Sequence, residues 1–339
     1  MQILRDEPLQ PYNTLSLQAR AAVLVRVGSD EELLAAFSLA AERDLPVVPL
    51  GEGSNVVLAR DLDALVLRQD TRGIEILEED GDKVRLRVAA GENWHALVQW
   101  TLHRGLYGLE NLALIPGTVG AAPIQNIGAY GIELKSHLLQ VQALAIADGQ
   151  SLVLSNAGCE FGYRDSVFKR GLRDKLVITA VDLQLSRVPE LRIDYPALAL
   201  AFAQTAIATP TPQDVFNTVV SIRRSKLPDP AVEPNAGSFF KNPVVPAELA
   251  QTLLVKFPGL SAYPQPDGRV KLAAAWMIEH CGWKGYREDD IGVHPQHALV
   301  IVNYGNDNGE QLLSLASKVA ATVADTFGVQ LAIEPRVYG

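Results

Sequence analysis

The sequence predicts an α+β protein built from two or three domains. Its 339 residues exceed the usual size of one domain, about 150 residues. Strand and helix signals alternate through the first third of the chain, whereas amphipathic helices with few strands dominate beyond residue 210. Thr211 and Pro212 predict the start of this last region, since Thr is a good helix N-cap and Pro favours the first helical position.

The first third is expected to alternate short strands with helices. Ser29 and Glu32 form a capping box that opens a helix, and Gly105 ends a second helix expected over 92–104. The buried face of the first helix is predicted as Leu33, Leu34, Phe37 and Ala41, and that of the second as Trp94, Leu97, Val98 and Leu102. Strands are expected at 21–27, 45–50, 56–58, 64–67 and 84–88.

The remaining two thirds should begin with strands and continue mainly as helices. Strands are expected at 140–147 and 175–185, a helix over 192–208, then helices at 212–225, 246–256, 271–281 and 309–327, with strands at 298–303 and 329–333.

Composition excludes several classes of protein. Thirty Lys and Arg against thirty-nine Asp and Glu give a net charge of −9 and a pI near 5.2, which argues against nucleic-acid binding. Hydrophobic residues at 48% and charged residues at 20% indicate a globular protein with a real core. Only Cys159 and Cys281 are present, so we expect no disulfide framework and a cytoplasmic location.

No membrane or metal partner is expected either. The N-terminus has no apolar core of a signal peptide. Two uncharged stretches, 111–132 and 195–213, are interrupted by prolines and are therefore interpreted as internal segments. His294 and His297 are separated by Pro295 and followed by a strand, which argues against a metal site.

The segment 49–55 joins two predicted strands through Gly51-Glu-Gly-Ser-Asn55. It does not complete the dinucleotide pattern, because Val56 stands where the third glycine would be and a strand follows in place of a helix. The segment could hold a phosphate through successive backbone N–H groups. A purely structural turn is the alternative.

The segment 115–131 is more informative. Its seventeen residues include four glycines and two prolines but no charge. Backbone closely wrapped on a flat, neutral ligand would explain this composition, with Gln125 and Asn126 bonding its heteroatoms. A tightly packed internal crossover is the alternative.

Several motifs together resemble the UDP-N-acetylenolpyruvoylglucosamine reductase family. They are the two glycine-rich segments, Phe161-Gly-Tyr-Arg-Asp-Ser166, Lys226-Leu-Pro-Asp-Pro230, Asn235-Ala-Gly-Ser-Phe-Phe-Lys-Asn-Pro243 and Glu334, in order over nearly the whole chain. Residues 192–208, with Tyr195, stand where the longer class of the family carries a tyrosine-bearing insertion.

The resemblance implies an FAD-binding fold of the vanillyl-alcohol-oxidase type followed by an α+β substrate domain. The implied parts are 1–70 and 71–210, the two FAD-binding subdomains, and 211–339, whose last strand returns Glu334 to the active site. Non-covalent FAD and NADPH are the implied cofactors. The implied FAD-binding residues are Gly51, Gly53, Ser54, Asn55, Pro116, Gly117, Gly120, Ile124, Gln125, Asn126, Gly128, Ala129 and Tyr130.

The implied reaction reduces an enolpyruvyl ether of UDP-N-acetylglucosamine to a lactyl ether, giving UDP-N-acetylmuramate for peptidoglycan synthesis. Arg164 would clamp the carboxylate, because its planar guanidinium fits the two oxygens. Ser238 would protonate the carbanion, and Glu334 would hold or polarise the enol end. The implied substrate contacts are Tyr195, Lys226, Asn242, Tyr263 and Lys271.

Two rival readings remain open. One is another flavoprotein of the same fold, and the other is a non-catalytic protein that binds a UDP-sugar. The joint presence of Arg164, Ser238 and Glu334 favours the reductase. We expect it to act as a monomer.

Overall fold

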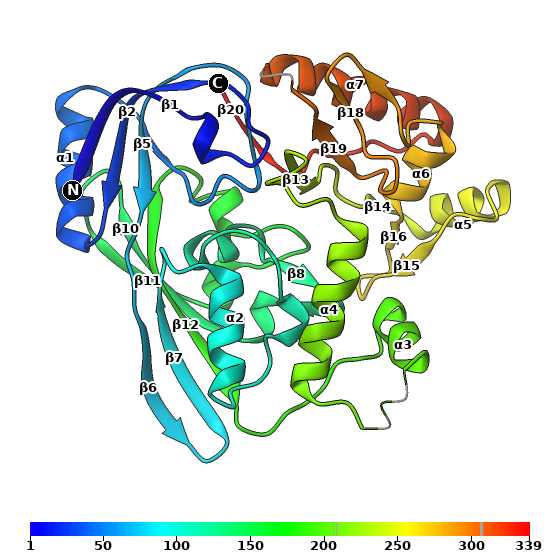
Figure 1. Cartoon of the computed structure of the whole chain (residues 1–339), viewed down its shortest axis with the longest axis horizontal. Helices are drawn as coiled ribbons and strands as arrows, with labels where there is room; N and C mark the ends of the chain where they lie inside the picture. The colour runs from blue at the N-terminus through cyan, green and yellow to red at the C-terminus, as the bar shows by residue number, and fades with distance from the viewer. Residues whose placement is uncertain (206, 208, 306–307) are drawn as a thin grey trace. The chain divides into compact units, whose positions relative to one another are not determined.

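The computed structural model describes residues 1–205, 207, 209–305 and 308–339, and divides them into two compact units (Figure 1). Unit 1 comprises Met1–Glu7, Ala21–Glu52 and Asp63–Ser225, and unit 2 comprises Pro8–Arg20, Gly53–Leu62 and Lys226–Gly339. The division falls after Ser225, although the sequence suggested a boundary near 210. The reason is that helix α4 (Pro212–Lys226) buries Val215, Phe216 and Val219 in the core of unit 1. The three-part division stays a prediction.

The first sheet of unit 1 has the strand order β1-β2-β5-β3. Its strands are β1 (Gln2–Pro8), β2 (Arg20–Val27), β3 (Val47–Pro49) and β5 (Leu62–Gln69). Helix α1 (Asp30–Glu42) begins where predicted, with the Ser29 side chain accepting from the Glu32 N–H. The predicted buried face of α1 is wrong in part, because Ala36 and Ala40 are buried beside Leu33 and Phe37 while Leu34 is 42% exposed and Ala41 also faces solvent.

Unit 1 also contains a five-stranded antiparallel sheet with the order β11-β10-β12-β7-β6 and the helices α2, α3 and α4 (Figure 1). The strands of this sheet are β6 (Ile74–Asp80), β7 (Lys83–Ala89), β10 (Leu138–Ala145), β11 (Ser151–Ser155) and β12 (Leu176–Ser186). Helix α2 (Trp94–His103) buries Trp94, Leu97 and Val98 as predicted, but Thr101 takes the place expected for Leu102. The rings of His95 on α2 and Phe216 on α4 stack 5.5 Å apart, so these two helices are neighbours.

The insertion predicted at 192–208 contains helix α3 (Pro196–Ala203), whose Leu198 and Phe202 are buried. Tyr195 is its N-cap residue. Ala206 and Ala208 of that prediction lie outside the described residues. Over the described residues, no helix combines the length and apolar character needed to cross a bilayer.

Over its described residues, unit 2 contains three small sheets and three of the predicted helices. Its strands are β4 (Val56–Leu58), β13 (Asn235–Ser238), β14 (Val244–Val245), β15 (Ala262–Pro264), β16 (Val270–Leu272), β17 (Arg287–Glu288), β18 (Ile291–Val293), β19 (Val300–Asn303) and β20 (Arg336–Tyr338). The sheet orders are β13-β19-β18-β17, β14-β16-β15 and the parallel pair β20-β4. The helices are α5 (Ala247–Lys256), α6 (Ala274–His280) and α7 (Gly309–Phe327).

The strand predicted at 329–333 is wrong. Only Ile333 forms an isolated bridge, with Phe240, and regular pairing begins at β20. The apolar pattern of 329–333 reflects burial of Val329 and Leu331 and not strand pairing. The α+β class predicted from the sequence is confirmed.

Candidate active site

The glycine-rich segment 115–131 folds as a series of turns anchored to the start of α2. It contains a 3-10 helix (Val119–Gln125) and the short hairpin β8 (Gly128–Ala129) and β9 (Ile132–Glu133). The Trp94 N–H donates to the Gly117 carbonyl over 3.0 Å, and the Gly120 N–H donates to the Ala90 carbonyl over 2.9 Å. A Cβ at Gly120 would lie only 2.6 Å from that of Ala90, so close packing of the protein itself requires glycine there.

Glu52 links the two glycine-rich segments within unit 1. Its Oε2 accepts from the Gly117 N–H over 2.9 Å, and its Oε1 accepts from the Asn93 side chain over 2.6 Å. Gly51, beside it, has no room for a side chain without crowding Thr118, since a Cβ would lie 3.0 Å from Thr118 Oγ1. Pro116 is exposed at the other end of this link.

The side chain of Asn126 is buried and committed to the protein. Its Nδ2 donates to Glu133 Oε2 and to the Gly162 carbonyl, over 3.0 and 3.1 Å, and its Oδ1 accepts from the Lys135 N–H over 3.0 Å. Its φ of 47° lies in the left-handed region, which Asn tolerates well. A hydrogen bond donated by its Nδ2 to a cofactor would require breaking one of these bonds, whereas its neighbours Ile124 and Gln125 are at least partly exposed.

Arg164 lies at the tip of a tight turn in which Gly162 and Asp165 exchange backbone hydrogen bonds. Its φ is 52°, and its Nη2 donates to the Gly128 carbonyl over 2.8 Å. Asp165 forms its ion pair with Arg170, which also bonds Glu160. Arg164 therefore points at the β8–β9 hairpin, called here the flavin-side hairpin because it carries predicted FAD-binding residues. The neighbouring Asp165 is paired with Arg170.

Arg223 on α4 is a residue that the sequence analysis missed. Its buried Nε makes no hydrogen bond within the part of the chain that the structure describes. Burial lowers the pKa of its guanidinium and the charge of Arg164 adds to this, whereas Tyr130 opposes it. Burial also raises the pKa of Tyr130. A signal was present in the sequence, since Phe216, Val219 and Arg223 follow helical spacing on one face.

Tyr195 lies against the same hairpin of unit 1. Its ring meets the ring of Tyr130 edge-on, with centroids 5.5 Å apart and planes at 78°. The Tyr195 side chain is nevertheless 42% exposed. It is thus available to a ligand while already in contact with Tyr130, a predicted cofactor residue.

In unit 2, the predicted phosphate-binding residues Gly53, Ser54 and Asn55 form a turn against residues 12–14. Gly53 has a φ of 66°, and a side chain there would overlap the Tyr12 carbonyl. The Asn55 carbonyl accepts from the Arg336 N–H over 2.9 Å, which joins the turn to the C-terminal segment. Ser54 is half-buried.

Unit 2 brings Ser238 and Glu334 into adjoining backbone. Ser238 ends β13 opposite Val300, directly after Gly237, whose φ is 69°. The Glu334 N–H donates to the carbonyl of Phe239, the residue after Ser238, over 2.9 Å. Glu334 is 9% exposed, so its carboxyl is held in a largely buried position.

The predicted substrate residues of unit 2 differ in how free they are. Tyr263 and Lys271 are cross-strand partners on β15 and β16, with the Lys271 ammonium 5.9 Å from the ring centroid, and Tyr263 is 45% exposed. Asn242 instead accepts from the Ala274 N–H over 2.9 Å and so caps α6. Lys226 is exposed. Burial lowers the pKa of His297, and the charges of His294 and Lys226 lower it further.

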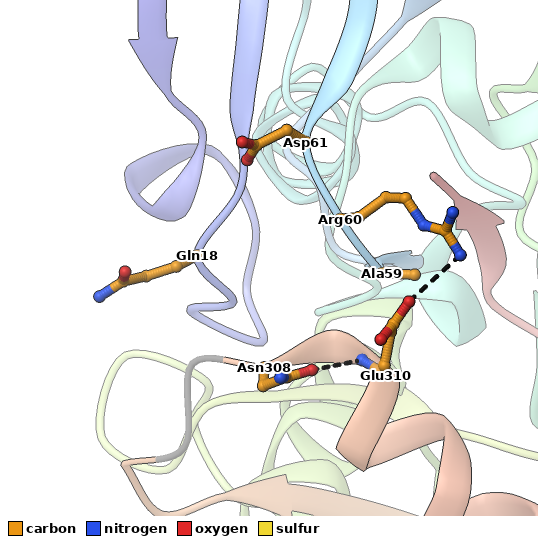
Figure 2. A pocket seen from close by; sticks show the side chains of 6 residues that line it. All are labelled: Gln18, Ala59, Arg60, Asp61, Asn308 and Glu310. Carbon is orange, nitrogen blue, oxygen red and sulfur yellow. Dashed lines mark hydrogen bonds and ion pairs between the residues drawn. The ribbon is translucent and has the colours of Figure 1, made fainter.

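Unit 2 also has a polar surface pocket. Figure 2 shows its lining, in which Arg60 and Glu310 form an ion pair of 3.1 Å and the Asn308 side chain accepts from the Glu310 N–H. None of the predicted site residues lines it. Over the described residues, no group of three or more His, Cys, Asp or Glu side chains could hold a metal ion.

Comparison with known proteins covers both parts of the chain. Residues 21–155 match the sequence model of an FAD binding domain, and residues 229–338 match that of the UDP-N-acetylenolpyruvoylglucosamine reductase C-terminal domain. The UDP-N-acetylenolpyruvoylglucosamine reductase of Chromobacterium violaceum is 52% identical over 338 residues, covering 99% of each chain. That of Pseudomonas aeruginosa is 48% identical over 330 residues, covering 97% of each.

A solved structure agrees. The crystal structure of UDP-N-acetylenolpyruvylglucosamine reductase from Thermus caldophilus superposes with a TM-score of 0.66 at 25% identity, covering 100% of this chain and 98% of that one. These matches confirm the FAD-binding fold expected for the N-terminal part of the chain.

Proposed function

The chain belongs to the UDP-N-acetylenolpyruvoylglucosamine reductase family, and on that premise we propose how its residues carry out the reaction. It is an FAD-dependent oxidoreductase of peptidoglycan synthesis that reduces UDP-N-acetylglucosamine-enolpyruvate to UDP-N-acetylmuramate. The observation that carries this function is the 52% identity to a named reductase over almost the whole of both chains. NADPH as the electron donor, a cytoplasmic location and action as a monomer complete the proposal.

The residues present fit FAD. The uncharged segment 115–131 offers a neutral wall to a flat ring, and the buried Nε of Arg223 offers a donor and a positive charge to an electron-rich edge. FAD, when bound, supplies the hydride that the reaction needs. Its predicted contacts in unit 1 are Gly51, Pro116, Gly117, Gly120, Ile124, Gln125, Asn126, Gly128, Ala129 and Tyr130, and in unit 2 Gly53, Ser54 and Asn55.

Arg164 is proposed to hold the substrate carboxylate. Hydride addition leaves a carbanion beside that carboxylate, and donors aimed at the developing charge lower the barrier. Two observations support Arg164: it bonds the Gly128 carbonyl, and Asp165 pairs with Arg170. Its guanidinium charge is therefore not cancelled by its sequence neighbour.

Ser238 is proposed to donate its Oγ proton to the carbanion. A serine hydroxyl is a weak acid, but the acceptor here is strongly basic, so transfer needs only close placement. Glu334 is proposed to polarise the enol end, a role that it can fill only when protonated or paired with a cation. The Glu334 N–H donates to the carbonyl of Phe239, the residue after Ser238, which supports a joint role for Ser238 and Glu334.

The UDP part of the substrate is assigned to side chains that are at least partly exposed. Lys226 is proposed to bind the diphosphate as a flexible point charge. Tyr195 is proposed to stack on uracil and to cover the site, and Tyr263, Lys271 and Asn242 to make further contacts.

Two half-reactions test this proposal. FAD-loaded Ser238→Ala should accept electrons from NADPH at the wild-type rate, whereas its reoxidation by the enolpyruvyl sugar should slow by about 10²–10⁴-fold. Stopped-flow absorbance of the flavin measures both steps. Ser225→Ala is the control, because the Ser225 hydroxyl donates to the Ile222 carbonyl within α4.

Other outcomes would favour the rival functions. Pure protein that stays colourless and takes up no FAD would exclude a flavoenzyme. Reoxidation by oxygen but not by the enolpyruvyl sugar would indicate another oxidoreductase, and sugar binding without electron transfer would indicate a non-catalytic protein. Equal slowing of both half-reactions in Ser238→Ala would remove Ser238 as the proton donor.

A further inference from the structure

Asn111 is a buried side-chain amide that joins two segments far apart in the sequence. It is 3% exposed and precedes the glycine-rich segment. Its Nδ2 donates to the Tyr130 carbonyl over 2.8 Å and to the Arg192 carbonyl over 2.7 Å. A primary amide has two N–H donors, so Asn111 uses both of them on these two carbonyls.

The two acceptors lie at functionally distinct places in unit 1. Tyr130 occupies the turn between β8 and β9 with a φ of 47°, directly after the predicted cofactor residues Gly128 and Ala129. Arg192 begins the insertion that carries Tyr195, three residues before it. The edge contact between the Tyr130 and Tyr195 rings is a second link between the same two segments.

The insertion is attached at its start by the Asn111 bond to Arg192 and further along by helix α3, which packs against the core of unit 1. Helix α3 buries Leu198 and Phe202, whereas Leu200 is 61% exposed. The Asn111 bond to Arg192 therefore fixes the root of the insertion, and the Tyr130 contact fixes Tyr195 itself. Loss of the Asn111 bond to Arg192 should weaken the Tyr130–Tyr195 contact, because both contacts hold the insertion to the β8–β9 hairpin.

We propose that Asn111 is a positioning residue that anchors the tyrosine-bearing insertion to the flavin-side hairpin and so presets Tyr195 for the substrate. The anchor itself is independent of the reaction, and its effect on substrate binding rests on the proposed function. Without the anchor, the insertion samples positions in which Tyr195 is displaced. Substrate must then bind to the fraction of molecules that is correctly arranged, which raises its apparent dissociation constant.

Hydrogen–deuterium exchange on the FAD-loaded protein tests the anchor directly. In Asn111→Ala, amides of residues 192–205 should exchange about tenfold faster than in the wild type, while β10 and β12 keep their protection. Asn156→Ala is a matched control. Asn156 also donates from Nδ2 to two carbonyls, those of Lys135 and Leu138, at 2.7 Å each, but touches neither Tyr130 nor the insertion in these bonds.

Steady-state kinetics supply the second measurement. Asn111→Ala should raise the KM for the enolpyruvyl sugar about tenfold, equivalent to about 1.4 kcal/mol, with kcat and flavin reduction by NADPH near wild type. Asn156→Ala should leave all three unchanged. If Asn111→Ala fails to fold, Asn111→Ser retains one donor and should show a smaller change of the same kind.

The outcomes separate the proposal from a general loss of stability. Wild-type exchange at 192–205 in the Asn111 variant would overturn the anchor, as would equal acceleration throughout unit 1. A wild-type protein without reductase activity would refute the proposed function, yet the exchange measurement would still decide the anchor. Faster exchange with an unchanged KM would overturn the role in substrate binding.

Discussion

The glycine-rich segment 115–131 and the β15–β16 hairpin present their predicted binding residues in opposite ways. In the segment, the protein itself uses the polar groups: Asn126 makes three side-chain hydrogen bonds, and Glu52 accepts from the Gly117 N–H. In the hairpin, Tyr263 is 45% exposed and pairs across the strands with Lys271.

This difference indicates two modes of recognition. A segment whose polar side chains bond other parts of the protein can offer a ligand mainly its backbone and its shape. Substitutions of these side chains should disturb the fold. A hairpin with exposed side chains can lose them without unfolding, and such changes should alter affinity alone. Substitutions in the two regions should therefore separate stability from substrate binding.

The largest effect is expected at Arg164, which contacts the glycine-rich segment but is expected to affect turnover more than stability. Although it bonds the Gly128 carbonyl, its main role is proposed to be in catalysis. Arg164→Lys can keep one hydrogen bond but loses the planar fork, so kcat/KM should fall about 10³-fold, equivalent to about 4 kcal/mol. The melting temperature should change little.

Arg170→Lys is the control from the same loop. Arg170 pairs with Asp165 and Glu160, so its substitution should affect the melting temperature slightly and turnover hardly at all. If Arg164→Lys lowered stability as much as it lowered turnover, Arg164 would be a structural residue like its neighbours.

The next effect is expected at Asn126. Asn126→Ala removes three partly buried side-chain hydrogen bonds, which should destabilise the protein by about 2–3 kcal/mol. Urea unfolding measures this. Asn242→Ala removes a single helix-capping bond and should lose only about 1 kcal/mol. Comparable losses would mean that the internal bonds of the segment are not what holds it.

Local signals predicted much of the fold. The Ser29 cap, the end of α2 near Gly105 and the start of α4 after Thr211 depend on residues within one turn, and the structure has all three elements. The prediction at 329–333 was wrong because its apolar residues are buried by distant partners. The burial of Leu34 was predicted wrongly for a similar reason. Which face of a helix is buried depends on the elements that pack against it, and the apolar pattern alone does not show these.

The candidate site was harder to predict in detail. Residue type suggested Asn126 as a ligand contact, but only the structure reveals that its amide is already used by Glu133, Gly162 and Lys135. Arg223 is a further example, because the sequence shows its place on α4 but not that its Nε is buried without a hydrogen bond among the described residues. The roles of Arg164, Ser238 and Glu334 stay predictions until they are tested.

A smaller effect is expected in the hairpin. Lys271→Met retains the apolar stem but removes the charge, so the KM for the UDP-sugar should rise about tenfold, equivalent to about 1.4 kcal/mol. The unfolding free energy should stay within about 0.5 kcal/mol of wild type, because methionine keeps the packing of the half-buried apolar stem. A clear loss of stability would erase the contrast between the two regions.

The smallest effect concerns pH and returns to the start of the glycine-rich segment. His95 Nδ1 accepts from the Leu114 N–H over 2.9 Å, which requires an unprotonated nitrogen. Burial lowers the pKa of His95 from 6.5, and the charges of Arg224 and Arg223 add to this. The unfolded chain therefore takes up the proton first as pH falls. The stabilisation is complete above pH 6.5 and is lost progressively below it.

Asn can place an acceptor near the same point without titrating, so His95→Asn should lose less unfolding free energy between pH 7.5 and pH 5.5 than the wild type does. Urea titrations at both pH values measure the difference, and parallel losses in the two proteins would show that this bond does not govern the acid sensitivity of the segment.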